Sequence, residues 1–133
     1  SYIDKKIALL NKKNKSYNNK ILVFNLLLSG SIEIKKLNKK FRKKDKSTDV
    51  LSFPFYEKKE LKKIMKKDQE IYLGDIIINL NKIKNKNNKK NFKDELNKLW
   101  IHGLTHLFGY RHKKQIDFLS MSRIEKKFLR YIN

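Results

Sequence analysis

The sequence predicts an α+β fold, in which a small mixed, mostly parallel sheet is packed with helices and a metal site lies at the end of a central helix. The expected elements follow the order strand, helix, strand, strand and then helices, which is typical of an α+β or an open α/β layer fold. All three histidines fall within residues 102–112, at the end of the longest expected helix. The 133 residues suffice to bury one core, so we expect a single domain over residues 1–133.

Three short apolar segments are the expected strands. Residues 21–28 form a continuous apolar run, residues 50–55 form a second one that ends at or just after Pro54, and residues 71–80 form a third one with Gly74 near its start. The first strand, the helix after it and the second strand could make a right-handed parallel crossover.

Apolar residues at helical spacing and capping signals mark the expected helices. Gly30 stands where an N-cap belongs, with Glu33 three residues later. Asn91 or Asp94 could cap the long helix, which is expected to stop at Gly109. A final amphipathic helix is expected over residues 114–131. The apolar face of the long helix comprises Phe92, Leu96, Leu99, Trp100, Leu104 and Leu107.

Lysine and asparagine dominate three stretches, residues 11–20, 57–70 and 81–91. Their polarity predicts solvated linkers or loop tips.

The formal net charge of +21 permits binding to a nucleic acid, because clustered lysines attract a phosphate backbone. The same charge has a second explanation in codon usage. Lysine, asparagine and isoleucine have AT-rich codons and are abundant here, whereas the chain has only four arginines. Both origins of the charge remain open.

Composition narrows the possible classes of protein. The absence of cysteine excludes a disulfide framework and a thiolate zinc finger, so histidine must supply any nitrogen ligation. No apolar run approaches the length of a membrane span, and nothing after Ser1 resembles a signal peptide. We therefore expect a cytoplasmic protein without a membrane partner.

The three histidines have the spacing of a metal site. His102 and His106 are four residues apart, which puts both rings on one face of a helix, and His112 follows just beyond Gly109. Three neutral imidazoles suit zinc with an open fourth position, where the pKa of a water falls from about 15.7 towards 7. A histidine pair at this spacing is also common on helix surfaces and in cores.

Several motifs together resemble the YbeY family, whose members are zinc-dependent endoribonucleases also described as rRNA maturation factors. Residues 102–112, HGLTHLFGYRH, are similar to the family signature HGxLHLxGYDH. Residues 38–55, NKKFRKKDKSTDVLSFPF, are similar to NxxYRxKDxPTDVLSFPF, and residues 73–76 match its LGDI strand. Met121 and Glu125 fall where the last helix of the family carries these residue types. Residues 1–20 show no convincing match.

The resemblance implies a metal-dependent endoribonuclease that prefers single strands and acts in rRNA processing, ribosome maturation and quality control. It implies one Zn²⁺ per chain held by His102, His106 and His112, with RNA of the ribosomal subunit as partner. A monomer is expected, and no DNA partner. The chain departs from the family pattern at Ser47, at Thr105 and, where the family has an aspartate, at Arg111.

Arg42 completes the predicted catalytic residues, beside the three histidines. Its guanidinium fork is suited to two parallel bonds to phosphate oxygens. Alternatively, it is a structural arginine paired with Asp45 or Asp49. Asp49 or Asp75 could replace part of the role of the missing aspartate, or could simply satisfy backbone amides at a strand edge.

Two other functions deserve comparison. A histidine pair at this spacing also begins the zinc metallopeptidase signature, but Gly103 stands where that class has its general base, a glutamate. The second alternative is a non-catalytic basic RNA-binding or ribosome-binding protein with a structural zinc. Metal-dependent RNA cleavage would distinguish the nuclease from it.

Overall fold

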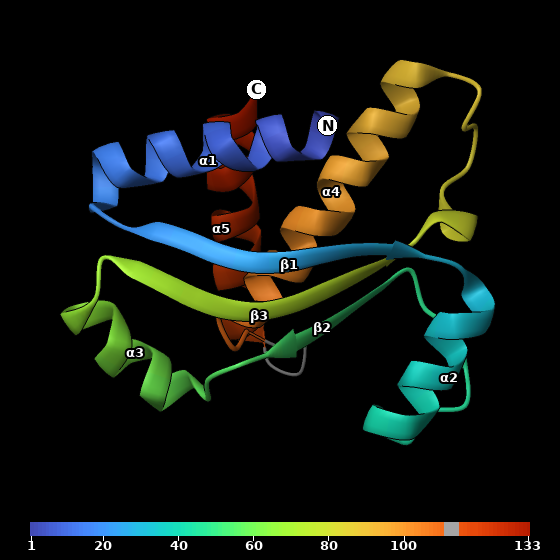
Figure 1. The fold of residues 1–133 in the computed structure, drawn as a ribbon, viewed down its shortest axis with the longest axis horizontal. Helices are drawn as coiled ribbons and strands as arrows, with labels where there is room; N and C mark the ends of the chain where they lie inside the picture. Colours follow the sequence, from blue (N-terminus) through green and yellow to red (C-terminus); the bar gives the residue numbers. More distant parts are fainter. Residues whose placement is uncertain (111–114) are drawn as a thin grey trace.

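The computed structural model describes residues 1–110 and 115–133. Helices and a small mixed sheet confirm the α+β class (Figure 1). In chain order the elements are α1 (Tyr2–Asn18), β1 (Ile21–Ser29), α2 (Ser31–Arg42), β2 (Val50–Pro54), α3 (Lys58–Lys67), β3 (Glu70–Asn79), the 3-10 turn η1 (Leu80–Lys82), α4 (Lys89–Leu107) and α5 (Gln115–Ile132).

The strand order in the described sheet is β1-β3-β2, so the last strand in sequence is the central one. β3 pairs with β1 in parallel and with β2 antiparallel. The sheet is mixed as predicted, but the parallel crossover expected for the first strand–helix–strand unit is wrong, because β2 runs in the opposite direction to β1. β3 buries Ile76 and Ile78 on one face and Ile77 on the other. A strand with apolar side chains on both faces is typically found at the centre of a sheet, where both faces are covered.

The main core lies between one face of the sheet and the helices α1, α4 and α5 (Figure 1). Trp100 and Leu104 of α4 are fully buried against β3, as the predicted apolar face of that helix requires. Burying one such large side chain contributes about 2–3 kcal/mol. A smaller cluster on the opposite face joins α2 to the sheet through Ile34, Leu51 and Ile77.

Two of the three stretches expected as linkers are helical instead. Residues 11–18 belong to α1, where Asn11 exchanges two hydrogen bonds with the backbone of Leu22 and Asn14 donates one to the carbonyl of Lys20. Residues 58–67 form α3, which buries Leu61 in the core. The abundance of asparagine and lysine had predicted exposed loops. The few apolar side chains, which are buried, and the hydrogen bonds of the asparagine side chains instead stabilise helices here.

The third stretch begins α4 earlier than expected. Its cap is Asn88, whose side chain accepts from the backbone amide of Asn91, so neither Asn91 nor Asp94 caps the helix. The predicted end is confirmed: α4 finishes at Leu107, and Gly109 turns the chain with φ +91°. Gly30 caps α2 as expected. None of the helices in the described part of the chain is both long and apolar enough to cross a bilayer.

Candidate metal centre

His102 and His106 lie on the last two turns of α4 with their rings side by side. Their Nε2 atoms are 3.1 Å apart, and the ring planes are nearly perpendicular at 89°. Two nitrogens bound to one tetrahedral zinc at about 2.0–2.1 Å would lie about 3.3–3.4 Å apart. The helix therefore brings the two nitrogens close to the separation that a shared metal ion requires.

The outer nitrogen of each ring has a hydrogen-bond acceptor. His106 donates from Nδ1 to the carbonyl oxygen of Tyr110 at 2.8 Å, and Nδ1 of His102 lies 2.6 Å from Oε1 of Glu125 on α5. A carbonyl or an ionised carboxylate can only accept, so the proton of each neutral ring is on Nδ1 and the lone pair is on Nε2. The two Nε2 atoms are also at hydrogen-bonding distance, so either a shared proton or a shared metal ion between them would stabilise the pair. The two Nε2 atoms therefore suit a metal ion. A carboxylate and a backbone carbonyl, here from Glu125 and Tyr110, are the groups that usually orient metal-binding histidines.

The third predicted ligand, His112, lies outside the described residues, and so does Arg111. Among residues 1–110 and 115–133 there is no group of three potential ligand side chains. The structure thus brings together His102 and His106, and metal binding by all three histidines stays a prediction.

Gly103 allows α4 to approach the sheet closely beside the histidines. A Cβ atom at this position would lie 2.6 Å from Cγ2 of Ile76 and 3.1 Å from Cγ2 of Val50. The buried hydroxyl of Ser52 donates to the carbonyl of Gly103 at 2.8 Å, which fixes β2 to α4. Gly103, which stands where a zinc metallopeptidase has its glutamate, therefore has a packing role in this fold.

Arg42 lies at the same cleft as the two histidines, although it ends α2. The cleft encloses about 340 Å³ and is lined by Arg42, Thr48, Asp49, Val50, Ser52, His102 and His106. The guanidinium of Arg42 donates to the carbonyl oxygen of Ser52 on the free edge of β2. Asp45, one of its suggested partners, forms ion pairs with Lys35 and Lys39 instead.

The two aspartates suggested as substitute carboxylates lie on different sides of the sheet. Asp49 lines the histidine cleft. Ile76 faces Gly103 of α4, and successive strand residues point to opposite faces, so Asp75 points away from α4. On that far face it accepts hydrogen bonds from Tyr72 and Asn25, at 2.9 Å each. The suggestion that Asp75 supplies a carboxylate at the histidine site is therefore wrong.

Sequence reasoning missed the roles of Glu125, Ser52 and the Tyr110 carbonyl. Glu125 had been noticed only as a position where the last helix resembles the YbeY family. Its contact with His102 crosses from α5 to α4, and no local spacing indicates such a pair. The contact between His106 and the Tyr110 carbonyl is more local. A glycine at position 109 allows the chain to turn back towards the last turn of the helix, where a backbone carbonyl can meet His106.

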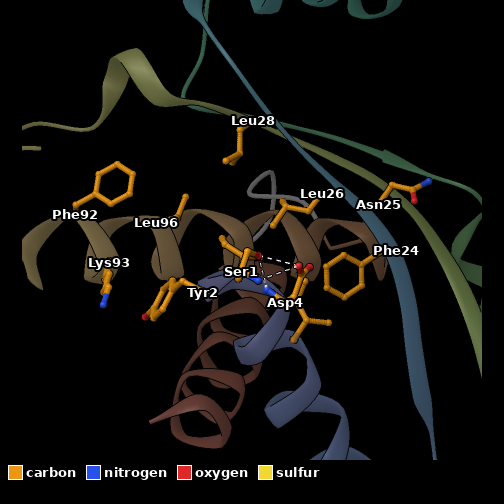
Figure 2. A pocket seen from close by; sticks show the side chains of 12 residues that line it. Ser1, Tyr2, Asp4, Phe24, Asn25, Leu26, Leu28, Phe92, Lys93 and Leu96 are labelled. Carbon is orange, nitrogen blue, oxygen red and sulfur yellow. Dashed lines mark hydrogen bonds and ion pairs between the residues drawn. The ribbon is translucent and has the colours of Figure 1, made fainter. Parts of the chain in front are cut away.

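A second cavity, of about 400 Å³, lies apart from the histidines, between the start of α1, the edge of β1 and the start of α4. Figure 2 shows the apolar side chains Phe24, Leu26, Phe92 and Leu96 around it, with the Ser1–Asp4 hydrogen bonds between them. It contains none of the predicted site residues, so the histidine cleft is the better candidate for chemistry.

Comparison with known protein families gives a match over almost all of the sequence. The family model described as Endoribonuclease YbeY matches residues 2–133. This match includes residues 2–20, for which the motifs alone showed no resemblance.

Similar proteins bear the name Endoribonuclease YbeY. The one from Pelagibacter ubique is 41% identical over 138 residues, which cover 91% of this chain and 86% of the relative. The one from Thermodesulfovibrio yellowstonii is 33% identical over 129 residues, with coverage of 95% and 74%. The solution structure of TM1509 from Thermotoga maritima is similar with a TM-score of 0.57 and 30% identity, over 97% of this chain and 82% of that one.

Proposed function

Because the chain belongs to the YbeY family of endoribonucleases, we propose that it is a zinc-dependent endoribonuclease that prefers single-stranded RNA. We further propose that it acts as a monomer in the cytoplasm, in rRNA processing, ribosome maturation and quality control. The net charge of +21 supports an RNA partner, since lysines that neutralise phosphates release counterions.

The observation that carries the proposal is the convergence of the His102 and His106 Nε2 atoms at 3.1 Å, with both Nδ1 atoms held by acceptors. His102 and His106 would hold the zinc ion, with His112 as the predicted third ligand. When bound, the ion supplies Lewis-acid stabilisation of negative charge on a phosphate oxygen. Histidine ligation favours zinc only by ligand type and availability.

Arg42 is proposed to bind and orient the scissile phosphate. Its guanidinium lines the cleft that contains both histidines, and one edge is anchored on the Ser52 carbonyl. A guanidinium anchored in this way keeps a defined orientation at the cleft, and its planar fork is the geometry that suits binding of phosphate oxygens. The residue would thereby hold the phosphate next to the histidine pair.

The first test is the metal content of untagged, natively purified protein, measured by elemental analysis. We expect about one zinc ion per chain and its loss in His106→Ala, because removal of one ligand dismantles the site. Lys98→Ala, at an exposed position one turn before His102 on the same helix, is the matched control and should retain the metal.

The second test is cleavage of a single-stranded RNA and of the same sequence as a duplex. Cleavage of the single strand that a chelator abolishes and zinc restores would support the nuclease. A protein that takes up no metal even when zinc is supplied would contradict the proposed function. Zinc binding without any RNA turnover would favour the non-catalytic RNA-binding or ribosome-binding alternative.

A further inference from the structure

Aromatic side chains line the outer face of the sheet, the face directed away from α4 and α5. This aromatic row consists of Phe41 at the end of α2, Phe53 on β2, and Phe55 and Tyr72 beyond it. The rings of Phe41 and Phe53 meet edge to face at 5.5 Å, and those of Phe55 and Tyr72 at 5.2 Å. Phe41 is 57% exposed and Phe55 is 63% exposed.

The fold leaves Phe41 and Phe55 largely uncovered, whereas Phe53 and Tyr72 are half-buried and Phe53 packs against the smaller core cluster. α2 covers the outer face with Ile34, which packs on Leu51 and Ile77, but Phe41 lies at the end of the helix, beyond this buried cluster. β2 is an edge strand, and α2 and α3 lie near its opposite ends (Figure 1). Neighbouring exposed large apolar side chains are a feature of interaction sites.

Arg42 connects the aromatic row with the histidine cleft. Its guanidinium carbon lies 5.8 Å from the centre of the Phe53 ring, while the same group lines the cleft and bonds to Ser52. Ser52 and Phe53 point to opposite faces of the sheet, as successive strand residues do. Arg42 therefore crosses the free edge of β2 and contacts both faces.

Cations accompany the rings. Nζ of Lys40 lies 5.2 Å from the centre of the Phe41 ring, and the last turn of α2 contains Lys39, Lys40 and Arg42. Flat exposed rings beside basic side chains are the usual means of holding a single nucleic-acid strand, with bases stacked on rings and phosphates near cations. An acidic or purely apolar partner would leave half of this chemistry unused.

We propose that Phe41 and Phe53 form a stacking site for an unpaired RNA base next to the phosphate at Arg42. The strand leaves the histidine cleft over the edge of β2 and continues along the aromatic row. The identity of this strand as RNA rests on the proposed function. A paired base has both faces covered by its neighbours, so this site accounts for a preference for single strands.

The test measures binding of a fluorescein-labelled uridine nonamer and of an abasic nonamer with the same phosphates, both in chelator so that no cleavage occurs. Wild type should bind the nonamer with bases more tightly. Phe41→Leu keeps an apolar contact with Phe53 but lacks a flat ring, and it should weaken binding of the uridine nonamer roughly 5- to 100-fold. Its affinity for the abasic nonamer and its salt dependence should stay unchanged, because no phosphate contact is lost.

Matched variants separate stacking from a structural effect. Phe41→Trp should bind the uridine nonamer at least as tightly as wild type, and Tyr17→Leu, at an exposed aromatic on α1, should leave binding unchanged. Equal binding of the uridine nonamer by wild type and Phe41→Leu would overturn the stacking site. Cleavage by the zinc-loaded wild type is scored separately, so loss of the nuclease proposal and loss of the stacking site are distinguishable.

Discussion

Glu125 on α5 places Oε1 2.6 Å from Nδ1 of His102 on α4. Both side chains are 29% exposed, so the contact is screened less than a pair on the open surface. Through this contact the packing of the last helix determines the orientation of a histidine that the preceding helix supplies. When Nδ1 of a neutral ring donates to this carboxylate, Nε2 is the nitrogen that remains to bind a metal ion beside His106.

Replacement of Glu125 by glutamine tests this arrangement. Glutamine retains an acceptor oxygen but lacks the charge that strengthens the ligand, so zinc affinity should fall about 10- to 100-fold. Competition with a chromophoric chelator measures the change. Glu60→Gln, at an exposed position on α3, is the matched control and should bind zinc as wild type does. Unchanged affinity in Glu125→Gln would show that the contact does not tune the site.

Arg42→Lys separates phosphate binding from metal binding. Lysine keeps the charge but cannot form the fork, so we expect kcat/KM for single-stranded RNA to fall about tenfold or more while zinc content is unchanged. Arg130→Lys, at an exposed position on α5, should be silent in both measurements. Cleavage by Arg42→Lys at the wild-type rate would contradict the proposed role of the guanidinium.

Gly103→Ala should destabilise the fold, because its Cβ would lie 2.6 Å from Ile76. Overpacking of this kind costs about 1–3 kcal/mol, and here it would also push α4 away from β2 and weaken the Ser52 hydrogen bond. Urea denaturation gives the free energy of unfolding. Gly30→Ser is the control, since the nearest atom to its Cβ is 3.5 Å away and serine is a good N-cap. A stable Gly103→Ala variant would mean that the helix can shift freely.

Tyr72 should make stability depend on alkaline pH. Its hydroxyl donates to Asp75, and this hydrogen bond, with smaller contributions from desolvation and the nearby charge, raises the pKa of the phenol above its usual value of about 10. The folded pKa is above the unfolded one, so the stabilisation is complete below the unfolded value and is lost as pH rises through the folded value. The difference in Tm between wild type and Tyr72→Phe should therefore shrink as the pH rises above the usual tyrosine pKa of about 10. A constant difference would contradict this linkage.

Much of the fold could be predicted because its signals are local. The apolar run of residues 21–28 became β1, and the helical spacing from Leu96 to Leu107 became the buried face of α4. Both signals depend on side chains within a few residues of one another. The predictions failed where lysine and asparagine concealed a sparse apolar pattern, as in α1 and α3.

The strand order was harder to predict from the sequence, because it depends on which strand is buried on both faces. β1 and β3 are both apolar runs, and only packing shows that helices cover Ile76 on one side while α2 covers Ile77 on the other. The parallel crossover was a sound expectation for consecutive strands. It is wrong here because β1 is parallel to β3 whereas β2 is antiparallel to it, so the two consecutive strands run in opposite directions.

By itself, the sequence determined the helix that presents His102 and His106 on one face and the glycine that ends it, since both follow from spacing within one helix. Only the tertiary structure decided that Arg42 and Glu125 flank these rings, and that Asp75 lies on the far face of the sheet. These relationships join residues that are distant along the chain. Their distances are set by how α2, β2 and α5 pack against α4, and no local pattern encodes that packing.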